Sequence, residues 1–159
     1  MIGAFLARLY PACAETGTQG LPIPDPVHLA RLADEAAGMG TLAAPGDFDV
    51  PADIVTPHYA ATPAALFAAL LRVGTAQPRC WLAAAYPTRL QAHFITRSAR
   101  LNFPDIIVAE ARQADAGSCV VMFSQSVYGR SNAPAHRRRL QDWLTALGAA
   151  LPIEPQGHI

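Results

Sequence analysis

The hydrophobic period of the chain changes once, near residue 80, and this change limits the folds that the sequence can adopt. Before it, apolar residues recur at helical spacing. After it, apolar and polar residues alternate, as in strands, over 80–86, 90–97, 106–111 and 118–126. Asp115-Ala116-Gly117 is a hairpin signal between the last two of these segments. Consecutive strands with short links predict an antiparallel meander.

Capping residues and prolines predict helices on both sides of these strands. A good N-cap residue starts each helix, a proline lies in its first turn and a glycine ends it. The expected helices are 25–38 with Asp25 as N-cap, 62–74 with Thr62 as N-cap, and 131–148 with Ser131 or Asn132 as N-cap. The last helix is amphipathic, with Leu140, Trp143, Leu144 and Leu147 on one face.

The order of these elements gives the fold class. Separate runs of helix and strand, without strict alternation, predict an α+β fold. We expect a single antiparallel sheet of about four to five strands, with the helices packed on one face and an amphipathic C-terminal helix. Residues 1–24 are expected to form an arm and 25–159 a single α+β domain. Residues 39–61 are expected to be a connection with a short strand near 53–56.

Composition excludes several classes of protein. The chain is 52% apolar and 15% charged, which argues against disorder, and its net charge of zero argues against binding nucleic acid. All 12 basic residues are arginine, so Schiff-base chemistry and the lysine-containing phosphate loop are excluded. The cysteines Cys13, Cys80 and Cys119 have no zinc-site spacing, so we expect free thiols and no metal site. No cofactor is expected.

The first ten residues, MIGAFLARLY, are too short to span a bilayer, which takes about 20 apolar residues. Arg8 interrupts them and no basic leader precedes them, so a signal peptide is not expected and the chain is expected to be cytoplasmic. Ile2, Phe5, Leu6 and Leu9 have the spacing of a helical stripe. This stripe either packs on its own domain or makes a peripheral contact with a membrane or a protein partner.

Charge is unevenly distributed along the chain. Residues 1–56 carry a net charge of −5 and residues 57–159 carry +5, which fits either internal complementarity or an anion site on the basic part. The densest basic cluster surrounds the start of the last helix and consists of Arg130, His136, Arg137, Arg138 and Arg139. Arginine forks and a helix N-terminus suit phosphate or carboxylate groups. The alternative is a solvated face, because successive helical residues point about 100° apart.

This geometry also gives an expectation for each side chain. His136 and Arg137 should lie toward the buried stripe, whereas Arg138 and Arg139 should face solvent near Asp142. A second polar group lies on the strands and could form a charged site at their ends: His93, Thr96, Arg97, Ser98, Arg100 and Asp105. Ser98, His93 and Asp105 can be read as a triad, but no nucleophile elbow accompanies them, and no catalytic residue is assigned.

The segment 124–140, SQSVYGRSNAPAHRRRL, resembles the C-terminal signature of the bacterial and plastid domain-of-unknown-function family 1499. The residues in register with that signature are Ser124, Ser126, Gly129, Ser131, Arg137, Arg139 and Leu140. Upstream, Thr96 and Phe103-Pro104-Asp105 stand in corresponding places, so the resemblance covers residues 60–150. It implies the architecture and no assigned activity. Members often carry a membrane anchor, which is not expected here.

The chain departs from the family pattern at polar positions. Val127, Asn132 and His136 replace the usual Arg, Asp and Asn, Pro134 replaces a Gly, and Ile106 replaces an Asp. The residues that are kept are mostly turn formers, caps and helix arginines. The resemblance therefore implies that any polar site shared by the family is altered or lost in this chain.

These observations favour a non-enzymatic binding or interaction domain with a protein partner, such as an accessory protein of a larger assembly. The alternative is a small-molecule binding protein or enzyme with a closed cavity between sheet and helices. Its polar lining would be Arg97, Tyr128, Arg130 and His136, with His136 as the candidate base. A third hypothesis is a binder of anions or lipid headgroups through Arg130, Arg137, Arg138 and Arg139.

Overall fold

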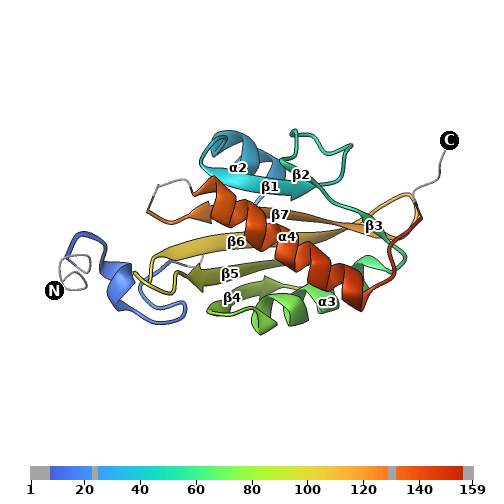
Figure 1. The fold of residues 1–159 in the computed structure, drawn as a ribbon. Coiled ribbons are helices and arrows are strands. Elements are labelled where there is room, and N and C mark those ends of the chain that lie inside the picture. The colour runs from blue at the N-terminus through green and yellow to red at the C-terminus, as the bar shows by residue number, and fades with distance from the viewer. Residues whose placement is uncertain (1–7, 23–24, 129–131, 156–159) are drawn as a thin grey trace.

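The computed structural model describes residues 8–22, 25–128 and 132–155. Its centre is a seven-stranded sheet with the order β2-β1-β7-β6-β5-β4, and β3 pairs with β7. The strands are β1 (Gly40–Ala44), β2 (Ile54–Val55), β3 (His58–Tyr59), β4 (Cys80–Tyr86), β5 (Gln91–Arg97), β6 (Pro104–Gln113) and β7 (Ser118–Ser126). The helices are η1 (Pro11–Ala14), α2 (Leu29–Glu35), α3 (Pro63–Ala76) and α4 (Ala133–Ala150). Figure 1 shows α3 and α4 together in front of the sheet.

The predicted meander is confirmed. Strands β4 to β7 are consecutive antiparallel neighbours, and β4 and β7 have the predicted bounds. Strand β6 is longer than its alternating segment at both ends. Gly117 in the β6–β7 turn has a φ of +73°, which a residue with a side chain rarely adopts. The Asp115-Ala116-Gly117 signal therefore predicted this hairpin because the turn needs a residue that can adopt a positive φ.

The expected number of strands is wrong because the segment 39–61 contributes strands of its own. Strand β1 pairs antiparallel with β7 and parallel with β2. From Thr41 to Ala44 the strand is buried on both faces, so its sequence does not alternate and gives no period of two. Strand β2 lies within the short strand expected near 53–56.

The expectation that the helices pack on one face is also wrong. Helices α3 and α4 cover one face, where Ile107 and Met122 point, and α2 covers the other, where Val108 and Val121 point. Leu29 of α2 is fully buried in this second cluster. The central strands are therefore buried on both faces and need helices on both sides.

Helix α2 begins at Leu29 and not near Asp25 as predicted. The side chain of Gln91 bonds both backbone polar groups of Val27, accepting from its N–H at 2.8 Å and donating to its carbonyl at 2.8 Å. These bonds fix the backbone of Val27 to β5, and the next residue, His28, is extended, so the helix starts after it. His28 becomes the N-cap, with Nδ1 accepting from the backbone N–H of Arg31.

Helix α3 follows the prediction at its start, where Thr62 Oγ1 accepts from the N–H of Ala65 at 3.1 Å. Helix α4 continues past Gly148, where it was expected to stop, and ends at Ala150. A glycine inside a helix costs only about 1 kcal/mol, which packing of the helix overcomes.

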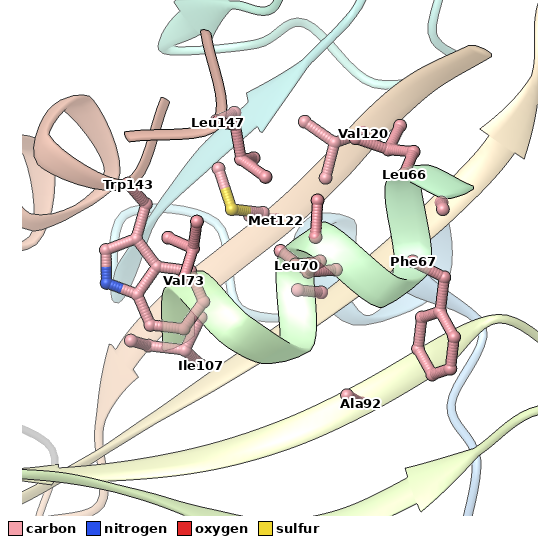
Figure 2. Packing of buried hydrophobic residues seen from close by; sticks show 14 of the residues in the cluster. Leu66, Phe67, Leu70, Val73, Ala92, Ile107, Val120, Met122, Trp143 and Leu147 are labelled. Carbon is pink, nitrogen blue, oxygen red and sulfur yellow. The ribbon is translucent and has the colours of Figure 1, made fainter. Parts of the chain in front are cut away.

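The main core lies between the sheet and helices α3 and α4 (Figure 2). Leu70, Met122 and Trp143 are fully buried there, and the rings of Phe94 and Trp143 meet edge to face at 5.0 Å. Gly74 of α3 lies against both rings, and a Cβ at this position would collide with them. A side chain here would push α3 away from the sheet.

The expected N-terminal stripe falls mostly on residues 1–7, which lie outside the described residues. Within the described part, Leu9 is exposed and the ring of Tyr10 packs on Phe103. Among the described residues, no helix is long and apolar enough to cross a membrane.

Candidate functional site

One end of the sheet carries polar residues on the face that α4 covers. The strand register places Thr96 of β5, Asp105 of β6 and Ser126 of β7 in one row across three neighbouring strands. The next row on this face holds Phe94, Ile107 and Ser124, and the row after it, Ala92, Ala109 and Met122, is wholly apolar. We call the following residues the polar end: Thr96, Asp105, Ser124, Ser126, His136 and Arg139.

Two side chains of α4 bind this row of polar residues. Arg139 donates to Asp105 Oδ2 from Nη2 at 2.9 Å, and its Nη1 reaches Ser124 Oγ at 3.1 Å and His136 Nδ1 at 3.2 Å. His136 Nδ1 lies 2.8 Å from Ser124 Oγ, and its Nε2 lies 3.3 Å from Ser126 Oγ. His136 and Ser124 are fully buried, whereas Asp105 and Arg139 are partly exposed. The first turns of α4 are thereby fixed to the sheet.

This network defines the protonation of His136. Burial lowers the pKa of His136, Asp105 at 4.0 Å opposes that shift and Arg139 adds to it, so the ring is neutral near pH 7. Because a guanidinium can only donate, Nδ1 facing Arg139 is the acceptor and Nε2 carries the proton. Nε2–H then donates to Ser126 Oγ. The serine hydroxyl beside the unprotonated Nδ1 is that of Ser124, which is fully buried. Within the described part of the chain, the cluster offers substrate no nucleophile paired with a base.

The triad suggested by Ser98, His93 and Asp105 is not assembled. His93 lies on the opposite face of the sheet from Asp105, and its Nε2 bonds Gln91 Oε1 at 2.9 Å. Ser98 Oγ accepts from the backbone N–H of Phe103 in the β5–β6 loop. Each of these polar residues therefore has a separate structural partner.

Arg97 supports the N-terminal arm. Its side chain lies on the face opposite α4 and donates to the carbonyls of Ala12, Gly17 and Gln19. Only 3% of the residue is exposed, and no carboxylate of the described residues forms an ion pair with it. Arg97 therefore contributes a buried positive charge at this end of the sheet.

The remaining sequence-predicted site residues separate into different environments. Tyr128 belongs to the arm contact, since its hydroxyl accepts from the N–H of Ala12 at 2.9 Å and its ring packs on Tyr10. Arg130 lies outside the described residues. Arg137 and Arg138 are exposed, and neither is in an ion pair with a described residue.

Two of the orientations predicted on α4 are wrong. Arg137 faces solvent and not the buried stripe, and Arg139 turns inward and not toward solvent. The partly buried carboxylate of Asp105 explains the second difference, because a buried charge requires a partner. The ion pair expected between Asp142 and the helix arginines does not form within 4.0 Å among the described residues.

A pocket of about 240 Å³ opens beside the polar end, between α4, the end of β5 and the segment before β4. Its walls include Gln77, Thr96, Arg138, Arg139, Asp142 and Trp143, and Arg97 borders it. Thr96 Oγ1 and Trp143 Nε1 are buried polar atoms with no hydrogen-bond partner in the described structure. Of the residues predicted to line a closed cavity, His136 and Tyr128 are engaged elsewhere, and the interior between sheet and helices is filled by core side chains.

A second pocket, of about 210 Å³, lies at the opposite end of β6 and β7. It is acidic, with walls that include Asp47, Asp49, His58, Arg112, Asp115 and Cys119. Among residues 8–22, 25–128 and 132–155, no group of three or more His, Cys, Asp or Glu residues could hold a metal ion.

Sequence reasoning named most residues of the polar end but missed the role of Trp143. The pattern placed Trp143 on the apolar face of α4, which is correct for its ring, and no sequence signal distinguishes an indole N–H that lacks an acceptor. Comparison of the chain with family models, curated proteins and solved structures finds no match. The resemblance to family 1499 therefore stays a prediction.

Proposed function

We propose that the chain is a non-enzymatic binding domain whose partner is a protein, and that the partner docks on the end of the molecule that holds the arm and the start of α4. The observation that carries this proposal is one aromatic cluster whose three rings come from segments that each also carry an exposed apolar residue. The cluster consists of Tyr10, Phe103 and Tyr128. The exposed apolar residues within two positions of these rings in sequence are Leu9, Leu101 and Val127, exposed by 57%, 44% and 38%.

These apolar residues come from three separate segments that the fold brings together. Leu9 precedes the arm residue Tyr10, Leu101 lies in the β5–β6 loop, and Val127 follows β7 and bonds the carbonyl of Pro104. Exposed apolar residues that form a patch are typical of an interaction site, and the contacts among the three rings keep these segments close together. Figure 1 shows the arm, this loop and the start of α4 at the same end of the molecule.

Charge around this end indicates the chemistry of the partner. Arg137 and Arg138 on the first turns of α4 are exposed and form no ion pair within the described structure. Arginine is enriched at protein interfaces, where it binds carboxylates through paired hydrogen bonds. We therefore expect a partner surface with an apolar centre and acidic side chains near it.

The polar end supports a non-enzymatic function. Nδ1 of His136 accepts from the Arg139 guanidinium, and the hydroxyl beside it belongs to the fully buried Ser124, whereas Nε2–H donates to Ser126. A base for nucleophilic catalysis needs the opposite arrangement, with its lone pair directed at an accessible hydroxyl. The network instead satisfies buried polar groups and fixes α4.

We also propose that the chain is a divergent member of family 1499. In support, matched residues far apart in sequence lie together at the polar end: Thr96, Asp105, Ser124, Ser126 and Arg139. His136, a departure from the family pattern, completes their hydrogen bonds.

Native mass spectrometry of the protein isolated gently from its own cells tests the docking proposal. We expect the wild type to carry the added mass of a protein chain, and the double variant L101D and V127D to lose it. Val55→Asp is the matched control, because Val55 is an exposed valine in β2, on the edge of the sheet away from the arm. It should keep the added mass.

Two outcomes contradict the proposal. The double variant could retain the partner as well as the control does, which would place docking elsewhere. The wild type could instead carry only the mass of a small molecule, which would favour the alternative of a metabolite-binding protein.

A further inference from the structure

We infer that the pocket between α4 and the end of β5 binds a carboxylate group. This inference rests on the proposed function, because it assumes that the chain is a binding domain. It adds the chemical group that the domain recognises. The pocket holds about 240 Å³, enough for a carboxylate with a short apolar stem. Its apolar wall includes Pro78, Ala135 and the ring of Trp143.

The first observation is a pair of buried donors without acceptors. Trp143 is fully buried and Thr96 is 6% exposed, yet Trp143 Nε1 and Thr96 Oγ1 have no partner among the described residues. A buried donor left unsatisfied costs about 1 to 3 kcal/mol, so two at one place need an explanation. An indole N–H can only donate, so the missing group at Trp143 is an acceptor.

The positions of these donors make them a single site. Thr96 belongs to β5 and Trp143 to α4, and both border the same pocket. Figure 2 shows the indole nitrogen of Trp143 on the edge of the ring turned away from Leu70 and Met122. The nitrogen therefore lies on the edge of the ring away from these two core residues, and Trp143 is one of the residues that line the pocket.

The second observation is the charge around the pocket. Arg138 and Arg139 line it together with Asp142, and Arg139 is paired with Asp105. These four charges cancel, and the buried Arg97 across the sheet adds one positive charge without a carboxylate partner in the described structure. A singly charged oxyanion balances this excess, whereas a phosphate group carries a charge of about −1.5 to −2 at pH 7.

The donor set also fits a carboxylate in number and kind. A carboxylate accepts through two oxygens, with about four lone-pair positions. The hydroxyl of Thr96 and the indole N–H of Trp143 supply neutral donors, and Arg138 supplies a charged fork at the rim. The carboxylate comes either from a free small acid or from an acidic side chain of a protein partner.

The indole N–H signal of Trp143 in proton–nitrogen NMR spectra tests the inference directly. The chain has two tryptophans, and Trp81→Phe assigns the two signals. The full chain is titrated at pH 7 and constant ionic strength with sodium propionate, sodium phosphate and an acetylated pentaglutamate amide. We expect the Trp143 signal to move and saturate with a carboxylate probe, and to respond more weakly to phosphate.

Variants separate the pocket from general attraction of anions. Thr96→Val removes one donor and keeps the shape of the side chain, and should weaken carboxylate binding about tenfold. Arg138→Gln should weaken it as well. Arg137→Gln is the matched control, because Arg137 lies on the same turn and is exposed but does not line the pocket.

The outcomes are distinct. Saturation with propionate supports a free acid as ligand, and saturation with the peptide alone supports a partner's side chain. A Trp143 signal that no carboxylate probe moves, tighter binding of phosphate, or equal loss in the Arg137 and Arg138 variants overturns the inference. Native mass spectrometry is read separately, so carboxylate binding without a protein partner contradicts the docking proposal alone, and a partner without carboxylate binding contradicts this inference alone.

Discussion

Two regions lie on the same face of the same strands and differ in almost every property. Under α3 and the second half of α4, this face presents Ala92, Ala109 and Met122, all fully buried among apolar groups. Two rows further along the same strands, it presents Thr96 and Asp105 under the first turns of α4. The backbone hydrogen bonding is the same in both regions, so the side chains alone make the difference.

The difference indicates what each region contributes. The apolar half is held by packing of its side chains, although the buried hydroxyl of Tyr59 in its cluster also has no hydrogen-bond partner in the described structure. In the polar end, His136 and Arg139 are held by hydrogen bonds, whereas Thr96 and the neighbouring Trp143, which border one pocket, keep buried donors without a partner in the described structure. Unmatched donors lower stability, and a region that keeps them is a candidate for function.

Removing apolar volume from the first region should have the largest effect. Leu70→Ala removes a fully buried side chain between α3 and the sheet, and should lower the free energy of unfolding by about 3 kcal/mol, within the usual range for such cavities. Urea unfolding followed by circular dichroism measures it. Leu71→Ala, at the half-buried neighbour, should cost clearly less, and equal losses would mean that α3 is not anchored through Leu70.

Breaking the ion pair of the polar end should have the next largest effect. Asp105→Asn leaves the partly buried Arg139 without its carboxylate and should cost about 2 kcal/mol, somewhat below the loss for a fully buried pair. Glu35→Gln is the control, since its pair with Arg31 is fully exposed to solvent and should contribute far less to stability. Equal effects of the two substitutions in urea unfolding would show that the polar end is solvated like the surface.

The meander could be predicted from sequence because its physics is local. Alternation, the turn at Gly117 and the cap at Thr62 each act within a few residues. Strand β1 and the start of α2 could not be predicted, because tertiary contacts decide them. The side chain of Gln91, distant in sequence, bonds both backbone groups of Val27, and the helix begins only after it.

Some features of the candidate site could likewise be predicted from sequence, whereas others depend on tertiary contacts. Polar residues at the strand ends and the arginines of α4 were visible in sequence, and Thr96, Asp105 and Arg139 do meet. The sequence could not show that Arg97 and Tyr128 serve the arm, because the carbonyls and N–H groups of the arm carry no sequence signature. Nor could it show that Arg139 turns inward, which depends on the register of β6.

Acid should weaken the fold through two buried histidines, one from each side of the sheet. Burial lowers the pKa of His93 and of His136, so the unfolded chain binds protons more readily than the folded chain below the ordinary value of 6.5. The free energy of unfolding should be flat for these groups above pH 6.5 and fall below it, by up to about 1.4 kcal/mol per pH unit for each histidine.

Urea unfolding at pH 7.5 and 5.5 measures this loss. His93→Gln should reduce the difference between the two pH values by up to about 1 kcal/mol, whereas His58→Gln, at a half-buried position in β3, should leave most of it. Stability that rises on acidification would contradict the sign of both pKa shifts.

The smallest expected effect is the most informative about the polar end. Thr96→Val removes a buried hydroxyl that has no partner in the described structure, so the free energy of unfolding should change by less than about 0.5 kcal/mol, in the stabilising direction. Ser124→Ala is the contrast, because that hydroxyl bonds His136 and Arg139, and its loss should cost about 1 to 2 kcal/mol.

The two substitutions together separate a structural hydroxyl from one reserved for a ligand. If Thr96→Val lowers stability as much as Ser124→Ala does, the Thr96 hydroxyl has a partner within the folded chain, and the pocket loses one of its two free donors. If Thr96→Val leaves stability unchanged and weakens carboxylate binding, the hydroxyl contributes to binding and not to folding. That result is expected of a residue kept polar in a buried row, where an apolar residue would serve the fold equally well.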